Sequence, residues 1–158
     1  MKIYNVIITL ATLTMTATIV PISHADQAAA NNIKYRQSGM MFMRWNMGVI
    51  KHNVIKEPQN YNKQAVIEAA NVLEAITHSG MFKLFTPDTA NGSGWKATRA
   101  KPALFTHPAK VKHHVEKVRL ESRELAEVVQ SGDINKIKRQ FKNLLNSCKA
   151  CHKDFRAK

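Results

Sequence analysis

Apolar side chains recur at alternating spacings of three and four residues in four separate stretches of the chain. Such a stripe is typical of one face of a helix in a bundle. The first stretch ends before Pro58, because proline cannot continue a helical hydrogen-bond ladder. Its stripe consists of Ile33, Arg36, Met40, Met43, Met47, Ile50 and Val54.

A second helix is predicted from about Asn62, whose side chain can cap the free N–H groups of the first turn. Residues 86–106 have no sustained period and are rich in Pro, Gly, Asn and Ser, so they are predicted to form a loop of about twenty residues. The stripe of the second helix consists of Val66, Ala69, Leu73, Ile76 and Gly80.

A third helix is expected to begin near Thr106, with Pro108 in its first turn. A fourth follows Ser131-Gly132, with Asp133 as its N-cap. The stripes are Val111, Val115, Val118, Ser122, Leu125 and Val129 in the third helix, and Ile134, Ile137, Phe141, Leu144, Cys148, Cys151 and Phe155 in the fourth.

Four helices joined by three connections predict an all-α fold, an antiparallel four-helix bundle. The length of 158 residues fits one domain. A hydrophobic content of 44% with 22% charged residues excludes a disordered chain. Six Gly, five Pro and 7% aromatic residues disfavour an all-β sandwich, and two Cys exclude a disulfide-dense small fold.

The N-terminal segment has the pattern of a secretory signal peptide. Lys2 precedes an apolar stretch at 3–20, and Ser23 and Ala25 are small residues at positions −3 and −1 of a cleavage site before Asp26. An uncleaved membrane anchor is the alternative, disfavoured by five Thr in the stretch. We therefore predict a signal peptide at 1–25 and a bundle domain at 26–158.

The charge of the chain has to be interpreted in the compartment that the signal peptide implies. The net charge is +13, and residues 26–158 keep 23 basic and 11 acidic residues, a net charge of +12 with His neutral. Export to the periplasm makes nucleic acid an unsuitable partner for this charge. We expect no membrane insertion after cleavage, and an acidic protein or an anionic surface as partner.

The strongest chemical signal is Cys148-Lys149-Ala150-Cys151-His152. Thiols at i and i+3 lie on one side of a helix and can add to the two vinyl groups of haem, forming thioethers. The next residue, His152, can coordinate the iron. The C-x-x-C-H string is the attachment signature of c-type haem, and it lies on the core stripe of an exported chain.

Other chemistries compete for these residues. A thioredoxin-like redox pair is expected at a helix start beside a βαβ unit, and a disulfide within one helix is strained. A zinc site would have three local ligands and would need a fourth. Thioethers also suit copper(I), and the candidate ligands for such a site are Met40, Met41, Met43 and Met47. Core packing is the better account, because Met40, Met43 and Met47 lie on the core stripe. An exported copper- or zinc-binding module is therefore the alternative from another class.

The chain resembles cytochrome c′, the class II c-type cytochromes, over essentially all of the sequence after residue 25. The matching motifs are Cys148 to His152 near the C-terminus, Tyr35-Arg36-Gln37, and Ala100 to Phe105. The resemblance implies one haem c per chain, attached through Cys148 and Cys151, with His152 as axial ligand. It also implies an electron carrier, a binder of nitric oxide or carbon monoxide, or both.

The resemblance assigns further residues to the haem. Arg36 and Gln37 match residues at the propionate edge, and Thr98 and Arg99 occupy the place of a loop that contacts the haem. The pattern itself agrees for Arg36, the one charged residue of its stripe, because a buried guanidinium needs an anionic partner. A guanidinium reaching to solvent at the helix start is the alternative.

Met40 lies one helical turn after Arg36, on the stripe that faces the core. In cytochrome c′ the matching residue shields the open face of a five-coordinate iron, whereas in related low-spin proteins a Met at this position is the sixth ligand. The spacing permits both. Arg156, one turn after His152, is expected to lower the basicity of that imidazole.

Met41, Trp45 and Val49 form a second apolar strip on the first helix, which is either a wide core face or a homodimer surface; we favour the dimer surface, as similar proteins use. No acid–base or nucleophilic constellation indicates an enzyme. The remaining histidines fall on polar faces or loops and are expected to be solvated; they are His52, His78, His107, His113 and His114.

Overall fold

The computed structural model describes residues 24–158, so the predicted signal peptide lies almost wholly outside the described residues. Five α-helices are present: α1 (His24–Lys51), α2 (Lys63–His78), α3 (Ala103–Thr106), α4 (Pro108–Val128) and α5 (Ile134–Phe155). A π-helical turn, η1 (His52–Lys56), extends α1. Short 3-10 turns lie at Pro58–Asn60, Met81–Leu84, Pro87–Thr89 and Val129–Ser131.

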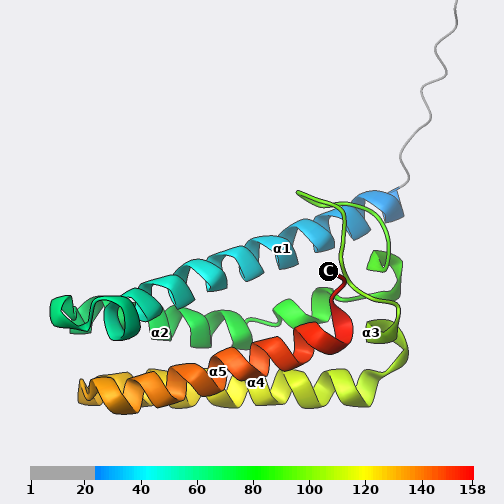
Figure 1. The fold of residues 1–158 in the computed structure, drawn as a ribbon. Coiled ribbons are helices and arrows are strands. Elements are labelled where there is room, and N and C mark those ends of the chain that lie inside the picture. Colours follow the sequence, from blue (N-terminus) through cyan, green and yellow to red (C-terminus); the bar gives the residue numbers. More distant parts are fainter. Residues whose placement is uncertain (1–23) are drawn as a thin grey trace, which may run out of the picture.

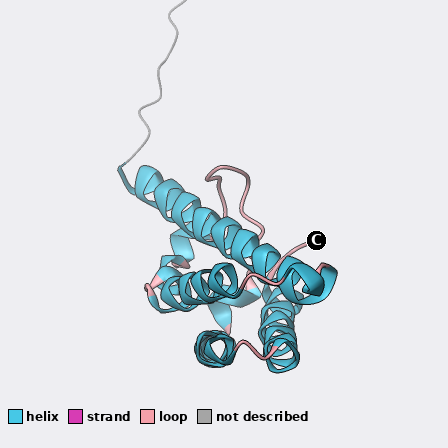
Figure 2. Cartoon of the chain, turned by 90° about the vertical axis from the view of Figure 1, so that its left-hand side faces the viewer, coloured by secondary structure: helices cyan, strands magenta, loops and turns pink. Residues whose placement is uncertain are grey.

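The four long helices run up and down in an antiparallel bundle (Figure 1), and a view along the bundle shows the helices packed beside one another (Figure 2). The predicted fold class is confirmed. The main contacts join α1 to α2, α2 to α4 and α4 to α5, while α5 meets the first helix through its π-helical end. At the other end of the bundle, the start of α1, the end of α5 and the long connection between α2 and α4 come together (Figure 1).

The helix starts follow local chemistry. Asn62 Oδ1 accepts a hydrogen bond from Ala65 N at 3.0 Å. Asp133 Oδ1 accepts from the backbone N–H groups of Asn135 and Lys136. Pro108 occupies the first turn of α4, where its missing N–H costs nothing. All three predicted helix starts are therefore confirmed within one or two residues.

The core agrees with most of the predicted stripes. Ile33, Ile50, Leu73, Leu125 and Ile137 are all at most 1% exposed. The departures are polar residues buried beside the stripes. Asn46 and Asn53 each donate to the carbonyl oxygen four residues earlier, which satisfies their amides inside the bundle. Glu121 is buried and accepts a 2.6 Å hydrogen bond from Gln140 Nε2.

The stretch predicted as an unbroken loop at 86–106 is partly ordered into a 3-10 turn at Pro87–Thr89 and the short helix α3. Its middle lies against α1, and Gly94 makes this approach possible. A Cβ there would lie 2.6 Å from Lys34 N and 2.9 Å from Ile33 C. Among the helices at 24–158, none is both long enough and apolar enough to cross a bilayer.

Candidate functional site

The last three turns of α5 carry the C-x-x-C-H residues. Cys148 and Cys151 are unpaired thiols and half-buried, and Cys148 packs against the core cluster of the bundle. Phe155, one turn after Cys151, is 3% exposed and anchors the same side of the helix. His152 is exposed. The turn therefore presents both sulfurs toward the interior and the imidazole toward its edge.

The electrostatics of this turn keep all three groups neutral. Burial raises the pKa of the Cys148 thiol, and burial together with nearby Cys148 and Asp154 raises the pKa of Cys151 to about 11. Partial desolvation, followed by the positive charges of Arg156 and Arg99, lowers the pKa of His152. A neutral imidazole keeps a free nitrogen lone pair, as a metal ligand must.

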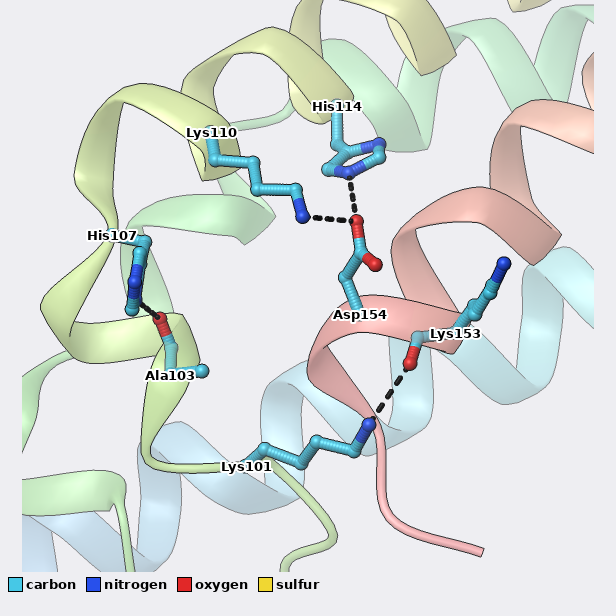
Figure 3. Close-up of polar contacts among 7 residues, drawn as sticks. All are labelled: Lys101, Ala103, His107, Lys110, His114, Lys153 and Asp154. Atoms are coloured by element: carbon cyan, nitrogen blue, oxygen red, sulfur yellow. Dashed lines mark hydrogen bonds and ion pairs between the residues drawn. The ribbon is translucent and has the colours of Figure 1, made fainter.

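On one flank the turn is tied to α4 through Asp154. Its Oδ2 lies 2.9 Å from His114 Nε2 and 3.0 Å from Lys110 Nζ, so two groups of α4 converge on one carboxylate oxygen (Figure 3). These hydrogen bonds, with Lys110 first, lower the pKa of Asp154. The prediction that His114 is solvated was wrong: its side chain is 12% exposed and packs edge-on against Phe155.

On the other flank the turn is tied to the loop before α3. Lys101 N donates to Phe155 O at 2.9 Å, and Ala157 N donates to Arg99 O at 2.8 Å. The Lys101 ammonium donates to Lys153 O at 2.9 Å (Figure 3). The loop is therefore fixed to the end of α5, and the Arg99 charge comes close to His152.

Arg36 on α1 is 3% exposed, which confirms that it lies on the buried stripe. Its Nη1 donates to Thr89 Oγ1 at 2.5 Å and to Leu84 O at 3.3 Å. Its Nη2 donates to Thr89 O at 2.9 Å and to Thr98 Oγ1 at 2.7 Å. The guanidinium also lies over the Phe85 ring, 4.4 Å from its centroid. The two Nη groups thus donate to four neutral oxygens of the connection.

Gln37, the next residue of α1, holds the connection from outside. Its Oε1 accepts from Trp95 N at 2.8 Å, and its Nε2 donates to Lys96 O at 2.8 Å. Ser38 Oγ accepts from the Trp95 indole N–H at 2.8 Å. Gln37 therefore contacts the segment around Trp95. The helical spacing of apolar residues in the sequence does not place this segment against α1.

Met40 lies one turn further along α1, half-buried against the same core cluster that Cys148 contacts. The structure therefore brings the predicted residues to one end of the bundle from three separate parts of the sequence. Arg36, Gln37 and Met40 come from α1, Thr98 and Arg99 from the loop, and Cys148, Cys151 and His152 from α5. The residues that the sequence analysis missed are Lys110, His114 and Asp154. No local pattern marks them, since the contact joins positions forty residues apart.

The donor set fits haem better than a bare metal ion. Two unpaired thiols on the inner side of one helix suit thioether formation, and a neutral imidazole beside them suits an iron ligand. Within residues 24–158, no group of three or more His, Cys, Asp or Glu side chains is placed to hold a metal ion.

Comparison with known proteins gives a consistent result. The family model for cytochrome c′ matches residues 31–156. A cytochrome c′ from Rhodocyclus tenuis is 46% identical over 126 residues, covering 80% of this chain and 93% of that protein.

Two solved structures share the fold. One is a cytochrome c′ with ligand-controlled dimer dissociation, 36% identical, with a TM-score of 0.77 over 88% of this chain and all of the other. The second is the nitric oxide complex of a cytochrome c prime variant from Alcaligenes xylosoxidans. It is 25% identical, with a TM-score of 0.72 over 82% of this chain and 97% of the other. With these matches and its two cysteines, the chain belongs to the cytochrome c′ family, and its cofactor is haem c.

Proposed function

We propose that this chain is a periplasmic monohaem cytochrome whose iron is five-coordinate, and that it carries electrons and binds nitric oxide or carbon monoxide. One observation carries the proposal: Cys148 and Cys151 are half-buried, unpaired thiols on one side of α5, and the adjacent imidazole of His152 is held neutral. When bound, haem supplies an iron that can take up one electron and one diatomic ligand.

The residues around the haem have separate tasks in this proposal. Cys148 and Cys151 anchor the porphyrin, and His152 provides its ring nitrogen to the iron. Partial burial, and then the nearby cations Arg156 and Arg99, hold the pKa of His152 down, which would weaken its donation to the iron. Met40, half-buried against the core cluster, would shield the open face of the iron and keep water away, which would favour small neutral ligands.

Arg36 and Gln37 hold the connection in place at the haem edge, together with Thr98. The guanidinium of Arg36, whose Nη groups bind loop oxygens, would also face a haem propionate in this proposal. The solved relative with bound nitric oxide supports gas binding in the family.

The absorption spectrum tests this function. A Soret band that survives acid-acetone extraction is expected, because thioethers hold the haem covalently. The reduced protein should have a broad high-spin spectrum and should respond to nitric oxide and carbon monoxide. Sharp, split α and β bands, or no response to either gas, would contradict a five-coordinate iron. Loss of those sharp bands in Met40→Ala would identify Met40 as a sixth ligand.

A homodimer is the second part of the proposal. The outer face of α1 exposes Tyr35, Met41, Phe42 and Trp45, each at least 50% exposed, and the rings of Phe42 and Trp45 stack at 5.7 Å. A groove between α1 and the end of α2 adjoins this face and is lined by Tyr35, Phe42 and Ile76 among others. One solved relative is a cytochrome c′ with ligand-controlled dimer dissociation. Sedimentation should therefore give a dimer that Phe42→Lys with Trp45→Lys converts to a monomer.

Export completes the proposal. Cleavage before Asp26 would leave α1 starting with an acidic residue in its first turn, which suits a helix N-terminus. Mass spectrometry of the protein from the periplasm should give an N-terminus at Asp26. A mature form that keeps residues 1–25 would contradict the signal peptide.

A further inference from the structure

Exposed basic side chains gather at the end of the bundle that contains His152. Lys149 and Lys153 are exposed and lie at i and i+4 along α5, on the side of the helix that carries His152. Arg156 is exposed in extended backbone just after the end of α5, and its charge acts on His152. Arg99 joins them from the loop, because its carbonyl is bonded to Ala157 N. We call these four residues, Arg99, Lys149, Lys153 and Arg156, the C-terminal basic face.

The one acidic residue between positions 149 and 158 does not interrupt this face. Asp154 turns toward α4, where Lys110 and His114 hold its carboxylate, whereas the Lys153 side chain points away from them (Figure 3). The adjoining loop at 96–101 contains three basic residues and no acidic one. The positive charge is therefore uncompensated where His152 reaches solvent.

On α4, by contrast, the charges are mixed. Four glutamates lie on α4, and those at 116 and 121 pair with lysines four residues earlier. At the opposite end of α5, Lys136 pairs with Asp133. Mixed charge of this kind gives a weak field beyond about 10 Å in salt, whereas clustered charge of one sign attracts and orients an oppositely charged partner.

We propose that the C-terminal basic face is the docking surface for an acidic electron-transfer protein. The inference rests on the proposed function, because His152, which would ligate the iron, is exposed beside these cations. A partner seated there would lie next to the residue that would hold the iron. In one encounter the partner loses one electron and the ferric haem of this chain gains it, and no proton or covalent bond is exchanged.

Charge reversal tests the surface. Lys149→Glu with Lys153→Glu removes two cations of the basic face. Lys138→Glu with Lys142→Glu is the matched control: it has the same i, i+4 spacing and charge change, shifted about 16 Å along the helix. All four lysines are exposed, so either double variant should fold. Circular dichroism melts and the yield of covalent haem check this.

Two readouts are used on the holoprotein. Binding of a flavodoxin, a small acidic protein, is measured by calorimetry at low and high salt, and its rate of reduction of the haem by stopped flow. At low salt we expect the Lys149/Lys153 variant to bind the flavodoxin about tenfold more weakly and to be reduced by it about tenfold more slowly. Both quantities should also depend less on salt than in the unaltered protein. The Lys138/Lys142 control should change about twofold or less. Reduction by hexaammineruthenium(II), a small cation, should become faster in the Lys149/Lys153 variant.

The opposite results would overturn the inference. Equal losses in the two double variants would show that net charge alone attracts the partner. If the Lys149/Lys153 variant were reduced more slowly by both the flavodoxin and hexaammineruthenium(II), the cause would be a damaged haem site and not a lost attraction for the acidic partner. A failure of the proposed function differs from these, because the unaltered protein would then lack covalent haem or its response to reductant and gas.

Discussion

Replacing Arg36 with methionine keeps much of the apolar volume of the side chain and removes its four hydrogen bonds to the connection. Two of the acceptors are backbone carbonyls, Leu84 O and Thr89 O. A buried acceptor left without a donor costs about 1–3 kcal/mol. Relief of the guanidinium's own desolvation, which lowers the pKa of Arg36, offsets part of this cost. We therefore expect a net loss of about 3 kcal/mol, or about 10 °C in Tm.

The assay combines thermal unfolding of the holoprotein with amide exchange of residues 84–98. Exchange should rise at Thr89 and Thr98, because the side chain of Arg36 joins these two parts of the connection. Arg44→Met is the control: Arg44 is exposed on the same helix, and its loss should change stability by about 0.5 kcal/mol or less.

Arg36→Lys separates two roles of this residue. Lysine keeps the charge but lacks the fork that reaches four oxygens at once. If the loop contacts dominate, Arg36→Lys should remain nearly as unstable as Arg36→Met. Full recovery in the lysine variant would show that charge toward a propionate is what matters. A loss below about 1 kcal/mol in Arg36→Met, or unchanged exchange at 84–98, would refute the reasoning from these hydrogen bonds.

Three further predictions concern single residues. Gly94→Ala should destabilise the protein by about 1–3 kcal/mol in denaturant titration, because its Cβ would meet the backbone of α1; Gly48→Ala, with nothing within 4 Å, should stabilise it. Hydrogen bonds from Lys136 N and Asn135 N lower the pKa of Asp133, so its contribution to stability is present above its usual value of 3.8 and is lost as the pH falls through the lowered folded value. Asp133→Asn should therefore be less stable than the unaltered protein near neutral pH, and the difference should vanish in acid unfolding curves; a constant difference would contradict the assignment. Met40→Ala should speed nitric oxide binding to the ferrous protein in stopped flow, and an unchanged rate would show that Met40 is no barrier.

Local chemistry in the sequence was enough for the helices and for the attachment motif. The apolar spacing of α5 and the cap at Asp133 act within a few residues of one another, so they can be read without knowing any partner. The same holds for Cys148, Cys151 and His152, whose spacing on a helix fixes their common side. Burial of Arg36 also followed from its position on the stripe.

The partners of these residues depended on the tertiary structure. Thr89 and Thr98 meet Arg36 from more than fifty positions away, and Asp154 meets His114 from forty. Such contacts arise only when the bundle closes, because helix packing decides which polar groups lose water together and must satisfy one another. The order within 86–106 has the same origin: the segment has no period of its own, and its shape comes from α1 and the end of α5.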